Sequence, residues 1–216
     1  MSSADRWVDI YNQVPLHDVP RHYAGMSQSP FLMKYLTEVL RLCPEGGTTC
    51  ETGIGSGYGA VWLSRRGINA HGIDYAPMIV ERAKQVNNIL GGDATFRVGD
   101  LFDLYDGKTR YNVIHHQGVL EHFIVPQIRA ALAQQIASAD WVVFSVPSVY
   151  YPFDAEFGDE RFLPLEEWRR ILEPFDIQEL KYYGDPQNGE IEQILCILKG
   201  RIEQSAGIAK KTKAND

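Results

Sequence analysis

The fold is decided by one stretch of the chain, Glu51-Thr52-Gly53-Ile54-Gly55-Ser56-Gly57-Tyr58-Gly59. Residues 48–52 predict a strand that runs into it, and residues 58–66 predict a helix that follows. Glycines at such a turn let backbone N–H groups approach a ligand, because no Cβ stands in the way. Glu51 would repel a phosphate and attract an amino group, and the turn lacks the Gly-Lys-Ser/Thr sequence of nucleoside triphosphate loops. We therefore expect either a structural turn or a binding loop for a ligand with positive charge.

Short apolar runs alternate with helical patterns on both sides of this stretch. Further strands are predicted at residues 70–74, 94–98, 111–115 and 141–146, and further helices at 77–90 and 125–137. Such alternation is typical of a parallel sheet covered by helices on both faces. The sequence therefore predicts an α/β fold with a doubly wound sheet.

The two ends of the chain differ from this pattern. Near the C-terminus, residues 176–183 and 192–198 predict strands joined by a turn too short for a helix, so we expect them to pair antiparallel. Residues 31–42 form an amphipathic helical pattern in the long segment before the first strand. We predict three parts: an N-terminal helical cap segment at 1–45, the main domain at 46–202, and a disordered polar tail at 203–216.

Composition limits the classes of function. The chain has 216 residues and a formal net charge of -7, which disfavours a broad nucleic-acid-binding face. The odd number of cysteines and their spacing predict buried thiols in a reducing compartment. The first residues lack the pattern of a secretory signal, and no apolar run approaches the roughly 20 residues that span a bilayer, so we expect neither a signal nor a spanning helix. We expect a cytoplasmic protein with neither a nucleic-acid nor a membrane partner, and its oligomeric state stays open.

Two acids follow predicted strands where ligands bind in open α/β sheets. Asp74 ends the second strand, and a carboxylate at that tip is suited to accept hydrogen bonds from both hydroxyls of a ribose. Asp100 follows the third strand, where it can accept from an adenine amino group with Leu101 against the ring. Together with the glycine turn, these residues predict a site for an adenosine-containing ligand.

The motifs together resemble the class I S-adenosylmethionine-dependent methyltransferases, in particular their small-molecule branch called type 11. The resemblance covers roughly residues 45–200 and is carried by E-x-G-x-G-x-G, the acid ending the second strand, G-D-L after the third and Q-G-V-L-E-H after the fourth. It implies a Rossmann-like sheet of seven strands with the last one antiparallel. It also implies S-adenosyl-L-methionine as cofactor and in-line transfer of a methyl group to an oxygen, nitrogen or carbon of a small-molecule acceptor.

The resemblance further assigns cofactor contacts at matching positions. Asp74 would hold the ribose with Tyr75 near the adenosine, and His116 and Gln117 would border the sulfonium and its methyl group. Asp100 and Leu101 would frame the adenine. The methionine portion would lie against Glu51 and the backbone of three glycines, Gly53, Gly55 and Gly57.

A nicotinamide-binding Rossmann domain is the nearest competitor. Residues 55–60 satisfy G-x-G-x-x-A, and Asp74 stands where such domains hold a ribose. Glu51 argues against this interpretation because a pyrophosphate would lie close to its carboxylate. The antiparallel terminal hairpin and the lack of a separate substrate domain also argue against it.

The segment after the fourth strand supplies a candidate catalytic group. His122 is the candidate general base, because histidine titrates near neutral pH, although it could instead brace the segment without touching substrate. The small-RNA 2′-O-methyltransferases hold a divalent ion with E-x-x-E-H here, but Gly118 replaces the first acid. Glu121 and His122 alone make a poor site for a hard cation, so we predict no metal. The N-P-P-Y motif is absent, so DNA adenine and release-factor glutamine are not expected acceptors.

Aromatic residues mark the expected acceptor side. Tyr150 and Tyr151 follow the fifth strand, and Tyr11 lies in the N-terminal segment, where these rings would stack on a flat acceptor or frame an amine. The alternative is that the aromatic rings cover the edge of the sheet. Acidic residues between 154 and 160 favour a neutral or cationic acceptor. An RNA or protein methyltransferase, and a non-catalytic regulator that binds S-adenosylmethionine, remain as alternative functions.

Overall fold

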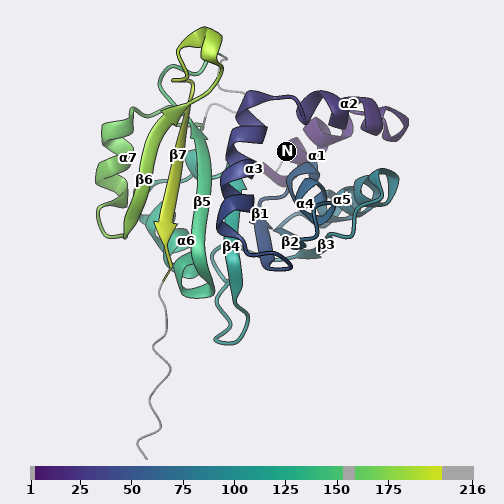
Figure 1. Cartoon of the computed structure of the whole chain (residues 1–216), viewed down its shortest axis with the longest axis horizontal. Helices are drawn as coiled ribbons and strands as arrows, with labels where there is room; N and C mark the ends of the chain where they lie inside the picture. Colours follow the sequence, from purple (N-terminus) through teal and green to yellow (C-terminus); the bar gives the residue numbers. More distant parts are fainter. Residues whose placement is uncertain (1–2, 153–158, 201–216) are drawn as a thin grey trace, which may run out of the picture.

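Seven strands form one sheet with the order β3-β2-β1-β4-β5-β7-β6 (Figure 1). The structure is a computed structural model, and it describes residues 3–152 and 159–200. The predicted tail at 203–216 lies outside the described residues. The strands are β1 (Thr48–Thr52), β2 (Asn69–Asp74), β3 (Thr95–Val98), β4 (Tyr111–Gln117), β5 (Ala139–Pro147), β6 (Ile177–Tyr183) and β7 (Gln193–Lys199). The predicted α/β, seven-stranded, Rossmann-like fold is confirmed.

Connection lengths determine the strand directions. The helices α4 (Tyr58–Ser64), α5 (Pro77–Leu90) and α6 (Val125–Ser138) each join two strands, and a helical crossover returns the chain parallel to its starting strand. Between β6 and β7 there is only the short helix η3 (Pro186–Asn188), so these strands pair antiparallel, as predicted. Strand β7 lies between β5 and β6 and is antiparallel to both of them.

Strands β4 and β5 are longer than the apolar runs that predicted them. The ladder continues through the pairs His116↔Phe144 and Gln117↔Ser145. The polar residues His116 and Gln117 therefore occupy paired strand positions. This extension carries β4 up to the glycine loop.

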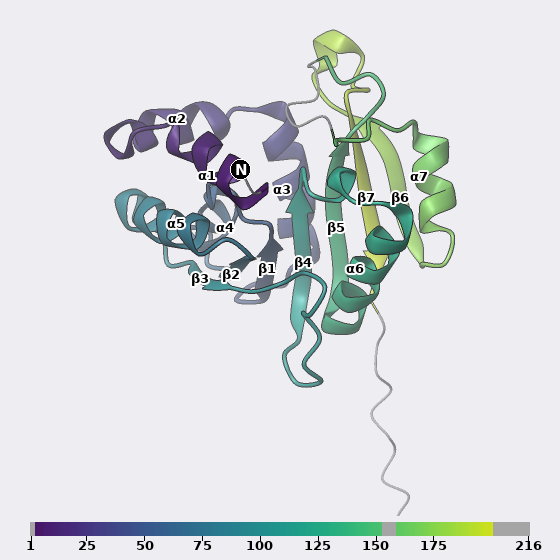
Figure 2. The ribbon, with the colours of Figure 1, turned by 180° about the vertical axis from the view of Figure 1, so that it is seen from behind.

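Helices cover both faces of the sheet (Figures 1 and 2). One hydrophobic cluster packs α3 (Pro30–Leu42), α4 and α5 against the first face. A second cluster packs α6 and α7 (Leu165–Leu172) against the other. No helix in the described ranges combines the length and apolarity needed to cross a membrane.

The N-terminal segment forms α1 (Ser3–Asn12), η1 (Leu16–Asp18), α2 (Val19–Met26) and α3. Helix α3 belongs to the main core, since Tyr35 and Leu36 are fully buried in the first cluster. Val19 of α2 is also buried, against Tyr58 and Val86. In contrast, α1 lies beyond the carboxyl ends of the central strands (Figure 2). The boundary predicted at residue 45 therefore separates two segments that share one hydrophobic core.

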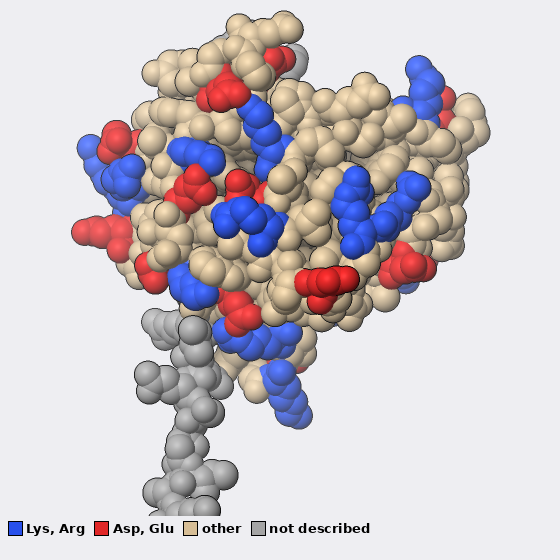
Figure 3. All heavy atoms as spheres, in the orientation of Figure 1, with Lys and Arg blue, Asp and Glu red and all other residues tan. Residues whose placement is uncertain are grey.

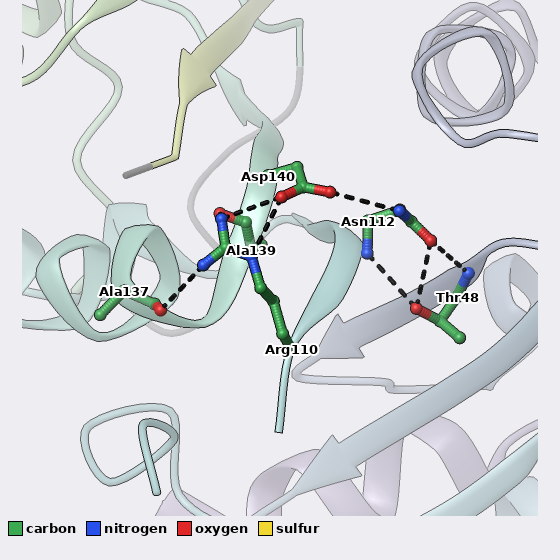
Figure 4. A network of polar contacts seen from close by, with 6 residues as sticks. All are labelled: Thr48, Arg110, Asn112, Ala137, Ala139 and Asp140. Carbon is green, nitrogen blue, oxygen red and sulfur yellow. Dashed lines mark hydrogen bonds and ion pairs between the residues drawn. The ribbon is translucent and has the colours of Figure 1, made fainter. Parts of the chain in front are cut away.

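A polar network fixes β1, β4 and β5 at their amino ends, opposite the glycine loop (Figure 4). The Thr48 N–H donates to Oδ1 of Asn112 at 2.9 Å, and Nδ2 of Asn112 donates to Oδ2 of Asp140 at 3.2 Å. Arg110 donates through Nε to Oδ1 of Asp140 at 3.0 Å. Through these contacts one asparagine links the first residue of β1 to the second residue of β5, which fixes the relative position of the three strands.

Replacing Asn112 with alanine should lower the free energy of unfolding by about 1–3 kcal/mol, because part-buried donors and acceptors lose their partners. Urea unfolding of both proteins measures this loss. The control is Lys84→Ala, which breaks an exposed ion pair with Glu81 and should change stability by less than about 0.5 kcal/mol. If the two variants were equally stable, Asn112 would not be the link described here.

Candidate functional site

A cavity of about 410 Å³ opens at the carboxyl ends of β1, β2 and β4. At this place the strand order reverses, because the chain leaves β1 toward β2 on one side and returns through β4 on the other. Connections diverge there and leave a crevice, where open α/β sheets bind ligands. The cavity is thus at the position that the glycine turn and the strand-tip acids predicted.

Two of the predicted glycines, Gly53 and Gly55, line the cavity. Both have a positive φ, of 72° and 48°, a conformation that side chains disfavour. A Cβ on Gly53 would lie 2.8 Å from Cγ2 of Val119, and one on Gly55 would collide with the Tyr11 ring. Glycine is therefore required here by backbone conformation and by close neighbours together.

The other two members of the loop prediction, Glu51 and Gly57, lie behind the cavity wall. Gly57 faces Ala83 and Phe96. Oε2 of Glu51 accepts the Ala60 N–H at 2.8 Å, which holds the carboxylate under the start of α4. Burial raises the pKa of the Glu51 carboxyl to about 8, and the nearby charge of Asp74 adds to that rise. A positive ligand group near Glu51 would favour its ionised form.

The four residues predicted around the adenosine all line the cavity: Asp74, Tyr75, Asp100 and Leu101. Asp74 accepts the Ala76 N–H at 3.0 Å through Oδ1, and burial raises its carboxyl pKa. Oδ1 of Asp100 accepts the Phe102 N–H at 2.8 Å, which holds the turn after β3 in place. The residues come together as the sequence suggested, and their cofactor contacts stay predictions.

The end of β4 supplies one of the two residues expected near the sulfonium. Gln117 lines the cavity, whereas His116 is fully buried and stacks on Phe144 with 5.3 Å between ring centroids. Its neighbour His115 is buried on the opposite face of the sheet, where Nδ1 lies 2.7 Å from the Tyr35 hydroxyl. Burial lowers the pKa of both imidazoles to about 3. His116 thus supports the sheet beneath the cavity without lining it.

The candidate base His122 lines the cavity at the end of the short helix η2 (Leu120–His122). Its Nδ1 lies 3.0 Å from Oδ1 of Asp159, which lines the same cavity. The rings of Trp7 and His122 make a T-shaped contact, with centroids 5.2 Å apart and planes at 85°. His122 therefore lies between the N-terminal helix and the segment that follows β5.

The three tyrosines predicted on the acceptor side separate into two places. Tyr11 lines the cavity beside the glycine loop. Tyr150 instead packs on Tyr182 of β6, and Tyr151 packs on Phe162. Neither Tyr150 nor Tyr151 lines the cavity, so only an acceptor that extends beyond the cavity could contact them.

Several lining residues were not identified from the sequence: Arg6, Trp7, Phe102, Val119, Phe123 and Asp159. Trp7 and Tyr11 are four residues apart on α1, which places both rings on one face, and that spacing was the available signal. No comparable pattern precedes Asp159, because its partner lies 37 residues earlier in the chain.

Acidic groups predominate around the cavity. Three carboxylates line it, from Asp74, Asp100 and Asp159, against one guanidinium, from Arg6. Such a field favours a ligand that carries positive charge and disfavours a pyrophosphate. The sulfonium and ammonium groups of S-adenosylmethionine fit this lining, and the side-chain-free glycine backbone leaves space for its chain.

One group of described residues has the geometry to hold a metal ion: His122, Asp159 and Glu160, with ligand atoms within 4.8 Å of one another. It contains neither Glu121 nor any second imidazole. The His122–Asp159 hydrogen bond already occupies one atom of each. The prediction that no metal takes part stays a prediction.

Comparison with known proteins agrees with this geometry. Residues 50–138 match the family described as a methyltransferase domain, a range that runs from β1 through α6. A search of curated protein sequences gives no significant match.

Solved structures share the fold at low sequence identity. The magnesium protoporphyrin IX methyltransferase of Synechocystis PCC 6803 with bound S-adenosylhomocysteine is 16% identical with a TM-score of 0.59, covering 93% of this chain and 89% of that one. A TehB-like SAM-dependent methyltransferase from Corynebacterium glutamicum is 19% identical, with a TM-score of 0.57 and coverages of 84% and 94%. A protein from a study of disulfide-to-thioacetal conversion in echinomycin biosynthesis is 18% identical, with a TM-score of 0.66 and coverages of 82% and 83%.

Replacing Asp74 with alanine should weaken binding of S-adenosylhomocysteine by about 1–3 kcal/mol, because hydrogen bonds to a charged group are lost. Calorimetric titration measures the affinity, and NAD and ATP should not bind comparably to either protein. Asp93→Ala removes an exposed acid outside the cavity and serves as the control. Equal affinity in a folded Asp74→Ala protein would remove this carboxylate from the site.

Glu51 also makes folding stability depend on pH. The pKa of its carboxyl is about 8 in the folded chain and an ordinary 4.5 in the unfolded chain. The protonated carboxyl therefore contributes fully to folding stability below pH 4.5, and this contribution is lost as the pH rises through about 8. The depressed pKa values of His115 and His116 act in the opposite sense, but only below their ordinary value of 6.5. Between pH 6.5 and 8, stability of the ligand-free protein should therefore fall with rising pH, by at most about 1.4 kcal/mol per pH unit from this one group.

Urea unfolding of wild type and Glu51→Gln across this range tests the effect, since glutamine keeps an acceptor for Ala60 and does not ionise. The variant should show the shallower decline. Glu45→Gln, an exposed acid before β1, should follow the wild type. Parallel profiles for Glu51→Gln and wild type would mean that Glu51 is ionised in the folded chain.

Proposed function

We propose that this chain, whose residues 50–138 match a methyltransferase domain, uses S-adenosylmethionine to methylate a small-molecule acceptor held between α1 and the turn after β4. The observation that carries the proposal is the cavity lining. Seven of the ten residues predicted to contact the cofactor line one cavity together with His122, and Trp7 and Tyr11 of α1 line it as well. The acceptor would bind beside His122, Trp7 and Phe123.

The cofactor contacts follow from the same lining. Asp74 would accept hydrogen bonds from the ribose hydroxyls, and Asp100 with Leu101 would frame the adenine. The backbone of Gly53 and Gly55 would lie along the methionine portion, with Glu51 behind it. In this arrangement the chain's residues bind and orient, which is the main contribution that a protein makes to methyl transfer.

When bound, S-adenosylmethionine would supply an electrophilic methyl group that a lone pair of the acceptor can attack, with the thioether sulfur as the leaving group. His122 would accept the proton that an oxygen or nitrogen acceptor loses, so that the product leaves uncharged. Gln117 and Val119 would border the reacting groups at the tip of β4. Trp7 and Tyr11 would exclude water and limit competing hydrolysis of the donor.

A small acceptor is favoured by enclosure and by surface charge. Arg6, Trp7 and Tyr11 of α1 line the cavity, so an acceptor must fit beside this helix or displace it. Basic and acidic side chains are interspersed on the face shown in Figure 3, and the net charge of the chain is -7. A nucleic acid would need a basic surface beside the cavity. The carboxylate of Asp159 at the acceptor end favours a neutral or cationic compound over a phosphorylated one.

The compartment we propose is the cytoplasm. Cys43, Cys50 and Cys196 are buried and free. Burial raises the thiol pKa of Cys43 to about 11 and that of Cys50 to about 12, which disfavours the reactive thiolate. Such thiols are typical of proteins in a reducing compartment.

Incubating the protein with methyl-labelled S-adenosylmethionine and separate pools of metabolites, RNA and protein tests the proposal. Label should enter the metabolite pool, and Asp74→Ala should reduce it at limiting cofactor. Transfer should persist in EDTA, because no metal is invoked. Label in RNA or protein alone would contradict the small-molecule acceptor. Retained cofactor binding with no label in any pool would favour the non-catalytic regulator.

A further inference from the structure

The contact between His122 and Asp159 joins two segments at the acceptor end of the cavity. His122 belongs to the turn after β4, and Asp159 belongs to the segment after β5. Nδ1 and Oδ1 are 3.0 Å apart, and both residues line the cavity. The backbone adds a second link between these segments, since the Arg161 N–H donates to the Glu121 carbonyl at 3.1 Å. The carboxylate is thus held against the imidazole by two connections.

This contact determines the tautomer of the imidazole. An ionised carboxylate only accepts hydrogen bonds, so the proton between the two atoms belongs to Nδ1 of His122. In a neutral ring the lone pair then belongs to Nε2. We propose that Asp159 is a positioning residue for methyl transfer, which holds His122 with Nε2 as its basic atom. This inference rests on the proposed function of His122 as general base.

The groups around the ring define its field. Glu160 follows Asp159 and brings a carboxylate oxygen within 4.8 Å of the other two ligand atoms, and buried Glu121 precedes His122. From α1, Arg6 lines the same cavity, and the Trp7 ring makes a T-shaped contact with the imidazole. Trp7 restricts rotation of the ring, so that the hydrogen bond and the aromatic contact together set its orientation.

The proton and electron balance is simple. The acceptor O–H or N–H gives its proton to Nε2, and its lone pair forms the bond to the methyl carbon. The electrons of the broken carbon–sulfur bond stay on sulfur, which becomes an uncharged thioether. Nδ1–H remains hydrogen-bonded to Asp159 throughout, and the imidazolium then returns its extra proton to water. No oxidant, reductant or metal is needed.

The tautomer can be measured without knowing the acceptor. Nuclear magnetic resonance of the whole protein with isotope-labelled histidine distinguishes Nδ1–H from Nε2–H, and the signal lost in His122→Gln identifies the ring among six histidines. Wild type should show the Nδ1–H form, and Asp159→Ala should shift the ring toward Nε2–H. The matched control is Glu160→Ala, which removes the neighbouring charge and should keep the wild-type tautomer.

An unchanged tautomer in Asp159→Ala would overturn the proposal, as would an equal shift in Glu160→Ala. S-adenosylhomocysteine affinity serves as the folding check for each variant. Manganese is added in a separate arm. Strong paramagnetic broadening of the His122 signal at micromolar manganese would identify the group as a metal site and would also overturn the proposal.

Activity on the labelled pool adds an independent test. Asp159→Ala should lower kcat at least about tenfold and His122→Gln about 10²–10⁴-fold, the usual contribution of a positioned base, both with little change in KM for the cofactor. The double variant should be no slower than His122→Gln, because Asp159 acts through that ring. Additive losses would refute positioning. Full activity of His122→Gln would instead refute the proposed base, whatever tautomer Asp159 selects.

Discussion

The parallel pairing of β1 with β4 is the constraint on which the rest of the structure depends. The chain leaves β1 in one direction and returns to β4 from the other, so the connections diverge and leave a crevice between their carboxyl ends. The asparagine network at the amino ends holds these strands in register. Because the register is fixed along the pair as far as Glu51 and His115, the residues that follow, Gly53 and Gln117, leave the sheet at the same end and both line the cavity.

Features of short segments made the proposed cofactor half of the site predictable. Glycine with positive φ, an acid at a strand tip and alternating helices are features of short segments, so the sequence alone located Gly55, Asp74 and Asp100. Strand ends were less predictable. His116 looked like a loop residue because polar side chains interrupt the apolar run, but the ladder continues and buries the ring between β5 and α6.

The acceptor half depends on contacts between distant segments, which a single sequence does not reveal. The Trp7 ring contacts His122 from α1, which precedes every strand in the chain. Asp159 contacts His122 from the segment after β5. Aromatic composition identified Tyr11, Tyr150 and Tyr151 equally, yet only Tyr11 lies in a helix that crosses the carboxyl ends of the strands. The two later tyrosines pack toward the terminal hairpin and Phe162 instead. Composition therefore indicates which residues can contact an acceptor, and only the tertiary arrangement decides which of them do.

The central claim is that the cofactor and the acceptor share a single cavity, and a crystal structure with S-adenosylhomocysteine tests it most directly. We expect electron density between the glycine loop and Leu101, with ribose hydroxyls within hydrogen-bonding distance of Asp74. The sulfur should lie beside Gln117 and Val119, on the side of the cavity that contains His122. Ligand density outside this cavity, or a ribose turned away from Asp74, would contradict the account.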